Sequence, residues 1–426
     1  MIKIMKFGSV PEKEIFSRSA PETDVAGTVK DIIADVRKNG DKALLYYTEK
    51  FDKAKLSSLA VTKEEIKEAA DSVPAEFLRI LNKAAENIRR FHEKQVREGF
   101  EIKGEDGVII GQKVIPVDRA GIYVPGGTAA YPSTVLMDSI PAKTAGVKEI
   151  VMVTPPGKDG KIDPVILAAA DIAGVDKIFK VGGAQAIAAL AFGTESVPKV
   201  DKIVGPGNAF VAEAKKQVFG EVSIDMIAGP SEIMIISDGK SVPSHLAADL
   251  LSQAEHDKMA SAVLITDSEE LAFAVSAEIE KQIPLLSRAE IARASIDSNG
   301  KIIITDDLIK AAEVANAIAP EHLELCVDDP FAMLSLIRHA GSVFLGRNCP
   351  EALGDYYAGP NHTLPTSGTA RFSSPLSVDD FIKKTQFTYY TKDALDRVAP
   401  DVAAFARSEG LTAHARSALI RSEKDL

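Results

Sequence analysis

The chain of 426 residues is poor in the residues that define several protein classes. It has no tryptophan and only two cysteines, Cys326 and Cys349, which are too few for a disulfide framework and suit the reducing cytoplasm. No apolar run approaches the roughly 20 residues that span a bilayer, and the first stretch, MIKIMKFGSV, lacks the apolar segment of a secretory signal peptide. We therefore expect a cytoplasmic protein without a membrane partner.

Positive charge is also scarce. The 50 basic side chains are outnumbered by 61 acidic ones, which gives a net charge of −11, and no basic stripe is present. Nucleic acid is therefore excluded as an expected partner. A hydrophobic content of 46% with 26% charged residues is that of an ordinary globular protein, and the length favours two or more domains.

Helical periodicity marks the first hundred residues. Residues 27–52 predict two helices divided by Gly40, and TKEE, from Thr62 to Glu65, has the spacing of a capping box. A further helix is predicted from Pro74 to about Glu98. Its His92 sits among charged residues and is expected to be solvated.

From Val108 onward, short β-branched runs such as EIVMVTPP and KIFKVGG alternate with Ala-rich helical segments such as PVILAAADIAG. This alternation predicts βαβ units and hence an α/β fold with two Rossmann-like domains, parallel sheets, and small N- and C-terminal helical extensions. The expected divisions are an N-terminal extension (1–24), a first α/β domain (25–122 with 232–370), a second α/β domain (123–231) and a C-terminal tail (371–426). The tail is too short for its own core, so it is expected to pack on another subunit.

Three glycine-rich turns adjoin the predicted strands and helices: IYVPGGTAAYPS, KVGGAQAIAAL and IVGPGNAFVAEA. Such turns can bring backbone N–H groups to a phosphate at a helix N-terminus, or they can simply be the tight turns of any α/β fold. None matches G-x-G-x-x-G. The amides Gln185 and Asn208, at the starts of their helices, favour nucleotide binding.

Two Glu-His pairs stand out among only seven histidines. In LSQAEHDKMA, on a helix predicted for 243–257, Gln253 and His256 share one margin of the apolar stripe and Glu255 points away. They can reach a metal from one helix, or they can form a solvated helix edge. In IAPEHLELCV, Glu321 and His322 follow a proline at the mouth of a strand, where they make a plausible acid/base pair.

Other candidates come from the C-terminal third. Cys326 lies in an alternating strand pattern and is expected to be a buried structural thiol. The long Gly- and Pro-rich loop GRNCPEALGDYYAGPNHTLPTSGTA offers Asp355 and His362, and Glu409 and His414 flank a helix break at Gly410. A metal set suited to zinc can be pooled from these segments: Gln253, His256, Asp355 and His414. H-E-x-x-H is absent, which excludes the usual zinc-protease arrangement.

Taken in order, eight segments together resemble the histidinol dehydrogenase family: GIYVPGGTAAYPSTVLM, KVGGAQAIAALAFGT, IVGPGNAFV, IAGPSEIMI, LSQAEHD, APEHLEL, GDYYAGPNHTLPT and EGLTAHARS. The resemblance implies zinc-dependent oxidation of L-histidinol to L-histidine via histidinal with two NAD⁺, the last step of histidine biosynthesis. It also implies a homodimer in which the C-terminal tail reaches the partner's active site.

The same resemblance implies roles for individual residues. Glu321 and His322 would be the acid/base pair, and residues 123–231 would form the NAD-binding domain, with contacts from Tyr123, Gln185 and Asn208. Zinc would be held by Gln253, His256, Asp355 and His414. The substrate would contact Ser231, Gln253, His256, His322, Asp355, Glu409 and His414, with His362 as a further candidate.

These roles give a mechanistic hypothesis. His322 takes the hydroxyl proton of the alcohol, Glu321 helps water add to the aldehyde, and His322 assists the second oxidation. A cysteine thiohemiacetal on Cys326 is the alternative second step. Two rival functions also remain: a zinc-dependent hydrolase in which Glu321 activates metal-bound water, and a non-catalytic binding protein of two α/β lobes.

Overall fold

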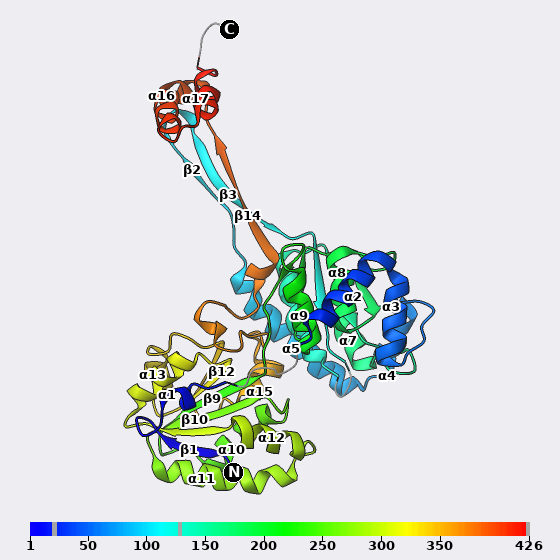
Figure 1. Cartoon of the computed structure of the whole chain (residues 1–426), viewed down its shortest axis with the longest axis vertical. Coiled ribbons are helices and arrows are strands. Elements are labelled where there is room, and N and C mark those ends of the chain that lie inside the picture. The colour runs from blue at the N-terminus through cyan, green and yellow to red at the C-terminus, as the bar shows by residue number, and fades with distance from the viewer. Residues whose placement is uncertain (19–23, 127–129, 423–426) are drawn as a thin grey trace. The chain divides into compact units, whose positions relative to one another are not determined.

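The computed structural model describes residues 1–18, 24–126 and 130–422. The chain forms two compact units. Unit 1 comprises Met1–Gln95 and Val117–Phe381, and unit 2 comprises Val96–Pro116 and Ile382–Leu426. Unit 1 contains two parallel sheets flanked by helices, whereas unit 2 contains a small antiparallel sheet and two helices (Figure 1). Within the described residues, no helix is long and apolar enough to cross a membrane.

The first sheet of unit 1 has six parallel strands. Their spatial order is β1 (Lys3–Lys6), β11 (Lys301–Ile304), β10 (Ser261–Thr266), β9 (Glu232–Ser237), β12 (His322–Cys326) and β13 (Ser342–Leu345). One face packs on α10 (Pro243–Ala254), α11 (Glu269–Gln282) and α12 (Ala289–Asn299). The other face packs on α1 (Glu12–Ile15), α13 (Leu308–Ile318) and α14 (Pro330–Leu334). Both faces are buried, which explains the nearly continuous apolar runs of the strands.

The second sheet has five parallel strands, in the order β6 (Lys177–Lys180), β5 (Glu149–Thr154), β4 (Arg119–Tyr123), β7 (Lys202–Val204) and β8 (Ser223–Ile224). One face is covered by α2 (Ala26–Asn39), α3 (Asp41–Tyr47), α8 (Gly183–Phe192) and α9 (Ala209–Val218). The opposite face is covered by α4 (Lys63–Ser72), α5 (Ala75–His92), α6 (Pro132–Ala145) and α7 (Pro164–Ala173).

The two sheets share one topology. In each, the first strand in sequence (β9 or β4) is central, the next two strands lie on one side of it and the last two on the other, with β1 as an additional edge strand in the first sheet. This order reverses direction beside the central strand, as in Rossmann-like sheets. The predicted fold class, an α/β fold with two Rossmann-like parallel sheets, is confirmed.

The predicted domain for residues 25–122 was wrong for most of its helices. We placed residues 25–122 with residues 232–370, but the buried side chains of α2 to α5, such as Val29, Val36 and Ile88, join the cores of the second sheet. Helical periodicity identifies the face that a helix buries but not the sheet that covers it. The N-terminal extension was also mis-assigned, because β1 pairs with β11 and Ile15 joins the core of the first sheet.

Unit 2 corrects the expected tail. Its central strand β3 (Ile109–Pro116) pairs antiparallel with β2 (Phe100–Lys103) and with β14 (Ile382–Tyr389), followed by α16 (Lys392–Ser408) and α17 (Thr412–Leu419) (Figure 1). We expected the tail to be polar and then helical, so β14 was missed. Most of its side chains are exposed, so apolar alternation could not mark it. Its partner β3 lies more than 260 residues away in sequence, and this pairing alone makes it a strand.

Several local predictions are confirmed. Gly40 has a φ of 52° between α2 and α3, and Thr62 and Glu65 make the predicted capping box at α4. The prediction for His92 was wrong. It is fully buried at the end of α5, where Nδ1 lies 2.7 Å from Gln95 Oε1 and Nε2 lies 3.4 Å from Asn361 Nδ2.

A buried polar network joins α6 to the loop at residues 361–363. Asn361 donates a hydrogen bond to the Met137 carbonyl (2.6 Å), and the Thr363 hydroxyl donates to Asp138 Oδ1 (2.7 Å). The Asp138 side chain is fully buried and its Oδ2 has no hydrogen-bond partner. Burial, reinforced by the negative charge of Asp225, raises the pKa of Asp138 to about 8. The carboxyl group is therefore protonated in the folded protein at neutral pH.

This raised pKa predicts a pH-dependent free energy of unfolding. Between the ordinary pKa of 3.8 and about 8, the folded state binds the Asp138 proton more tightly than the unfolded state does. The stabilisation from Asp138 is therefore complete below the pKa of the unfolded state and is lost as the pH rises through the pKa of the folded state. Between the two pKa values, the free energy of unfolding falls by about 1.4 kcal/mol per pH unit. When the free energy of unfolding is measured with urea at pH 6 and pH 8, it should fall less between the two for Asp138→Asn than for wild type. Asp171→Asn, on the exposed side of α7, is the control, and equal pH slopes for wild type and Asp138→Asn would contradict the assignment.

Candidate active site

A cavity of about 490 Å³ in unit 1 is lined by residues from both sheets. Ser231, Glu321 and His322 come from the amino ends of β9 and β12 in the first sheet. The turn Gly205–Asn208 comes from the carboxyl end of β7 in the second sheet. Other lining residues are Tyr131, Gln253, His256, Asp355 and His362. The cavity thus brings together most of the residues that sequence analysis selected.

The acid/base candidates are held by the backbone of the neighbouring strand. Glu232 N–H donates to Glu321 Oε2 (2.8 Å), and His322 Nδ1 lies 3.0 Å from the Glu232 carbonyl oxygen. Because a carbonyl only accepts, this contact assigns the imidazole proton to Nδ1. Nε2 lies 3.4 Å from Asp355 Oδ1. The structure therefore confirms that both side chains face one cavity, and it aims Nε2 at the metal candidate Asp355.

Burial and the neighbouring charges shift the pKa values of Glu321 and His322 in opposite directions. Burial raises the pKa of Glu321 to about 8, although the neighbouring His322 opposes the rise. Burial lowers the pKa of His322, but the carboxylates of Glu321, Asp355 and Glu351 outweigh it and raise the pKa well above its usual value. The two groups lie 3.6 Å apart, so the charge on each side chain shifts the pKa of the other.

The first metal candidates lie at the end of α10. That helix ends at Ala254 rather than at 257, but the His256 N–H donates to the Gln253 carbonyl (3.1 Å), so the two residues still share one turn. Gln253 is buried and His256 is exposed, and both line the cavity. The predicted apolar stripe of this helix, including Leu246, Leu250 and Ala254, is confirmed as buried.

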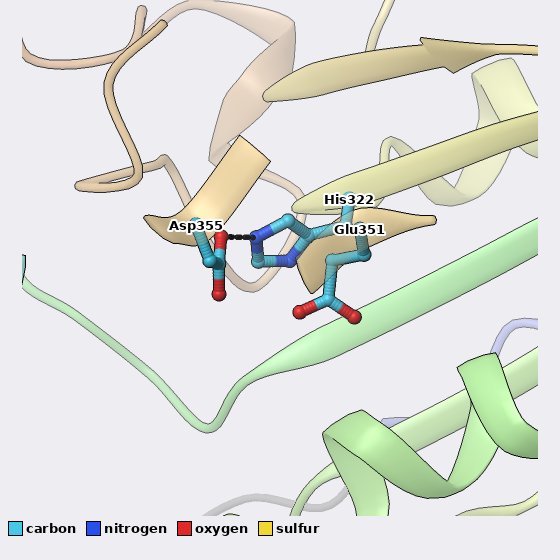
Figure 2. Close-up of side chains that lie close together, drawn as sticks. All are labelled: His322, Glu351 and Asp355. Carbon is cyan, nitrogen blue, oxygen red and sulfur yellow. Dashed lines mark ion pairs between the residues drawn. The ribbon is translucent and has the colours of Figure 1, made fainter. Parts of the chain in front are cut away.

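Asp355 belongs to a second possible ligand group that the sequence analysis did not identify. His322, Glu351 and Asp355 offer ligand atoms within 4.8 Å of one another (Figure 2). Glu351, in α15 (Glu351–Leu353), is buried and accepts hydrogen bonds from Gln253 Nε2 (2.6 Å) and Ser252 Oγ (3.1 Å). Its position four residues before Asp355 could have signalled a shared helical face. Glu351 thus fixes the amide of Gln253 and lies beside Asp355.

Glu409 and His414 lie in unit 2, whereas the residues that line the cavity belong to unit 1. Glu409 ends α16 and His414 lies in the first turn of α17. Gly410, with a φ of 76°, separates the two helices. The predicted helix break is therefore confirmed.

The nucleotide candidates lie at the carboxyl end of the second sheet. The Tyr123 hydroxyl accepts from the Gly183 N–H (3.1 Å), and Gln185 is buried in the first turn of α8. Asn208 caps α9, since its Oδ1 accepts from Phe210 N–H (3.0 Å) and Val211 N–H (3.2 Å). Asn208 lines the cavity, while Tyr123 and Gln185 support the turn before α8. Part of the first glycine-rich turn, residues 127–129, lies outside the described residues.

A second cavity, of about 760 Å³, adjoins the carboxyl end of β5 and was not foreseen from the sequence. Its lining includes Phe51, Asp52, Gly126, Thr154 and Pro155. Asp52 Oδ2 is buried without a hydrogen-bond partner, and burial raises the pKa of Asp52 to about 6. No local pattern marks Asp52, because only the fold brings the π-helical turn after α3 (Thr48–Asp52) to the turn after β5.

Cys326 does not contribute to the cavity. It lies at the carboxyl end of β12, in the core beneath α10, with Sγ 3.8 Å from Glu324 Oε2. Burial and the neighbouring Glu324 raise the pKa of its thiol, and the thiolate is the nucleophilic form. The prediction of a buried structural thiol is confirmed, and the geometry disfavours a thiohemiacetal at this residue.

Comparison with known proteins identifies the family. The family model described as histidinol dehydrogenase matches residues 17–422. The chain belongs to the histidinol dehydrogenase family. It is 55% identical to the histidinol dehydrogenase of Clostridium acetobutylicum over 99% of both chains, and 55% identical to that of Bacillus subtilis over 93% of both. The crystal structure of histidinol dehydrogenase from Elizabethkingia anophelis superposes with a TM-score of 0.94 at 39% identity, covering 99% of this chain and 98% of that one. The expectation of an NAD-dependent oxidoreductase of the histidinol dehydrogenase family is therefore confirmed.

Proposed function

We propose that this chain oxidises L-histidinol to L-histidine by way of histidinal, with zinc and two NAD⁺, as the last step of histidine biosynthesis. One observation carries the proposal. A single cavity joins an acid/base pair, a set of oxygen and nitrogen metal ligands, and a glycine-rich turn at the switch point of a Rossmann-like sheet. A zinc-dependent hydrolase would leave that turn without a role.

The side chains of the cavity fit a zinc ion. The Gln253 amide, the His256 imidazole and the Asp355 carboxylate are donors that zinc accepts. Because Glu351 accepts from Gln253 Nε2, the oxygen of that amide is left free for a metal. His414 of a second copy would complete the set. When bound, the ion would orient the substrate by holding its imidazole and amino nitrogens.

NAD would lie along the carboxyl end of the second sheet and, when bound, would accept one hydride in each half-reaction. The backbone N–H groups of Gly207, Asn208 and Ala209, at the start of α9, would face its pyrophosphate. Tyr123 and Gln185 would support the neighbouring turn. The second cavity is large enough for the adenosine half, and the unpaired Oδ2 of Asp52 can accept a hydrogen bond from a ribose hydroxyl.

The proton steps belong to the acid/base pair. Since the Glu232 carbonyl binds His322 at Nδ1, Nε2 is the nitrogen that, in the neutral imidazole, takes the hydroxyl proton of the alcohol. Glu321, in its ionised form, takes a proton from the water that adds to the aldehyde, and the Glu232 N–H holds its carboxylate in place. His322 gives its first proton to the aldehyde oxygen as water adds, and Nε2 then takes a hydroxyl proton of the hydrated aldehyde. Ser231 and His362 line the same cavity and would contact the substrate.

A homodimer would bring Glu409 and His414 to the partner's cavity. Unit 2 exposes large apolar side chains, with Phe100 54%, Ile102 53% and Phe405 70% exposed, which fits a surface that packs on a second copy. A cytoplasmic location and the absence of nucleic-acid and membrane partners stay predictions.

The overall reaction can be tested by its stoichiometry. Purified protein loaded with zinc and given limiting L-histidinol and excess NAD⁺ should produce two NADH per histidinol, measured at 340 nm, and L-histidine as the product. Glu255→Ala, beside the metal candidates but not lining the cavity, is the control and should behave like wild type. Reduction of one NAD⁺, or of none, would contradict the proposal.

Glu321→Gln should separate the two half-reactions. The amide cannot accept a proton from water, so histidinal oxidation should slow by about 10²- to 10⁴-fold, whereas histidinol oxidation should slow by less than 10-fold. Single-turnover rates with histidinol and with histidinal measure the two steps. Equal losses in both steps would remove the role assigned to Glu321.

The shared site can be tested by complementation. His256→Ala and His414→Ala should each lower the zinc content and the activity, because each removes one ligand. Mixing the two variants under subunit exchange should restore both ligands at half of the sites in the mixed dimer, or up to about a quarter of wild-type activity in a statistical mixture. A dimer by light scattering that regains neither zinc nor activity would contradict a ligand set shared between subunits.

A further inference from the structure

Arg18 precedes the gap in the described residues and lies at the amino edge of the first sheet. Its Nε lies 2.8 Å from Glu232 Oε1, and its Nη2 donates to Glu232 Oε2 (3.2 Å). The same Nη2 donates to the carbonyl oxygens of Ile318 (2.6 Å) and Ala319 (3.3 Å). One guanidinium therefore joins the start of β9 to the end of α13.

Both segments that Arg18 joins lead directly to the acid/base pair. Glu232 supplies the N–H bound to Glu321 and the carbonyl bound to His322. Ala319 is two residues before Glu321, and it adopts a left-handed conformation (φ 53°, ψ 68°) that is strained for a residue with a Cβ atom. Such a conformation persists only where its surroundings hold it. The bonds of Arg18 to the carbonyls of Ile318 and Ala319 provide that support.

Arg18 itself is held in place. The ammonium group of the buried Lys301, on β11, donates to the carbonyls of Ile15 (3.1 Å) and Ser17 (2.7 Å). The side chain of Ile15 is buried in the core of the first sheet, which anchors the segment that carries Arg18. Gly368, with a φ of 79°, passes so close that a Cβ there would lie 2.4 Å from Arg18 Nη1. The arginine thus occupies a site shaped by three separate parts of unit 1.

We propose that Arg18 is a positioning residue for the oxidation, acting through Glu232 and the 318–319 turn to hold Glu321 and His322 in their working geometry. This inference rests on the proposed function. Arginine suits the task because its planar fork can bind a carboxylate and carbonyl oxygens at once, whereas lysine offers a single charged nitrogen.

The test compares Arg18→Gln, Arg18→Lys and Glu232→Gln with a matched control. Arg293→Gln breaks a comparable two-pronged pair with Glu280, in which both side chains are 33% exposed, against 29% for Arg18. Arg18→Gln should lower kcat in both half-reactions by about 10- to 100-fold, since small misplacements of catalytic groups have effects of this size. The KM for NAD⁺ should stay within twofold, and Arg18→Lys should recover part of kcat. Arg18→Gln/Glu232→Gln should be no slower than the slower single variant, because the two act through one contact.

A second readout does not depend on turnover. The ¹⁵N and ¹H resonances of the His322 imidazole should report a hydrogen-bonded Nδ1–H in wild type and in Arg293→Gln, and an altered one in Arg18→Gln. A wild type without histidinol oxidation would contradict the proposed function alone. The positioning role is overturned if folded Arg18→Gln keeps the wild-type imidazole resonances, if it keeps the wild-type kcat, or if Arg293→Gln loses as much kcat as Arg18→Gln.

Discussion

The parallel pairing of β9 with β12 is the interaction on which the site depends. It places His322 opposite Ile233, so the backbone of Glu232 meets both members of the acid/base pair. Two adjacent residues of a strand would normally face opposite sides of the sheet. Here Glu321 lies just before the strand begins and bends back to the Glu232 N–H, while His322 reaches the Glu232 carbonyl. The backbone of β9 thereby fixes the orientation of the Glu321 carboxylate and of the His322 imidazole, with a proton on Nδ1.

The two sheets share a strand order, but the cavity adjoins the carboxyl ends of the strands in one sheet and the amino ends in the other. In the second sheet the cavity adjoins the carboxyl ends of the strands, where Rossmann-like sheets bind ligands. At the carboxyl ends of β9 and β12 in the first sheet, Arg347 Nη2 donates to both carboxylate oxygens of Asp238 (2.5 and 2.7 Å), while its Nη1 pairs with Asp328 (3.0 Å). The candidate acid/base residues Glu321 and His322 lie at the amino edge instead. Fold topology alone would therefore have indicated the wrong edge of the first sheet.

Much of the site was accessible from residue types and spacing. The acid/base pair, the Gln253–His256 turn, Asp355 and the glycine-rich turn before Asn208 were selected from sequence, and all line one cavity. Glu351 and Asp52 were not selected. Glu351 lies four residues before Asp355, a spacing that the sequence analysis did not use, and Asp52 lies about 100 residues before the turn after β5 that it adjoins. Both residues are distinguished by buried carboxyl oxygens, and burial of an acidic side chain cannot be read from the sequence alone.

The features that could be predicted from residue order are local: the alternation of strands and helices, the capping box at Thr62, the buried stripe of α10 and the helix break at Gly410. Each depends on residues within a few turns of one another, so periodicity and capping chemistry are sufficient. Three long-range contacts became known only from the folded chain: the second sheet covers α2 to α5, β14 pairs with β3, and Arg18 binds Glu232 across 214 residues of sequence. These contacts join distant segments whose individual patterns are compatible with several partners. The choice among those partners is made by the packing of the whole unit, because the folded arrangement buries most apolar faces of the helices and strands and pairs most buried polar groups.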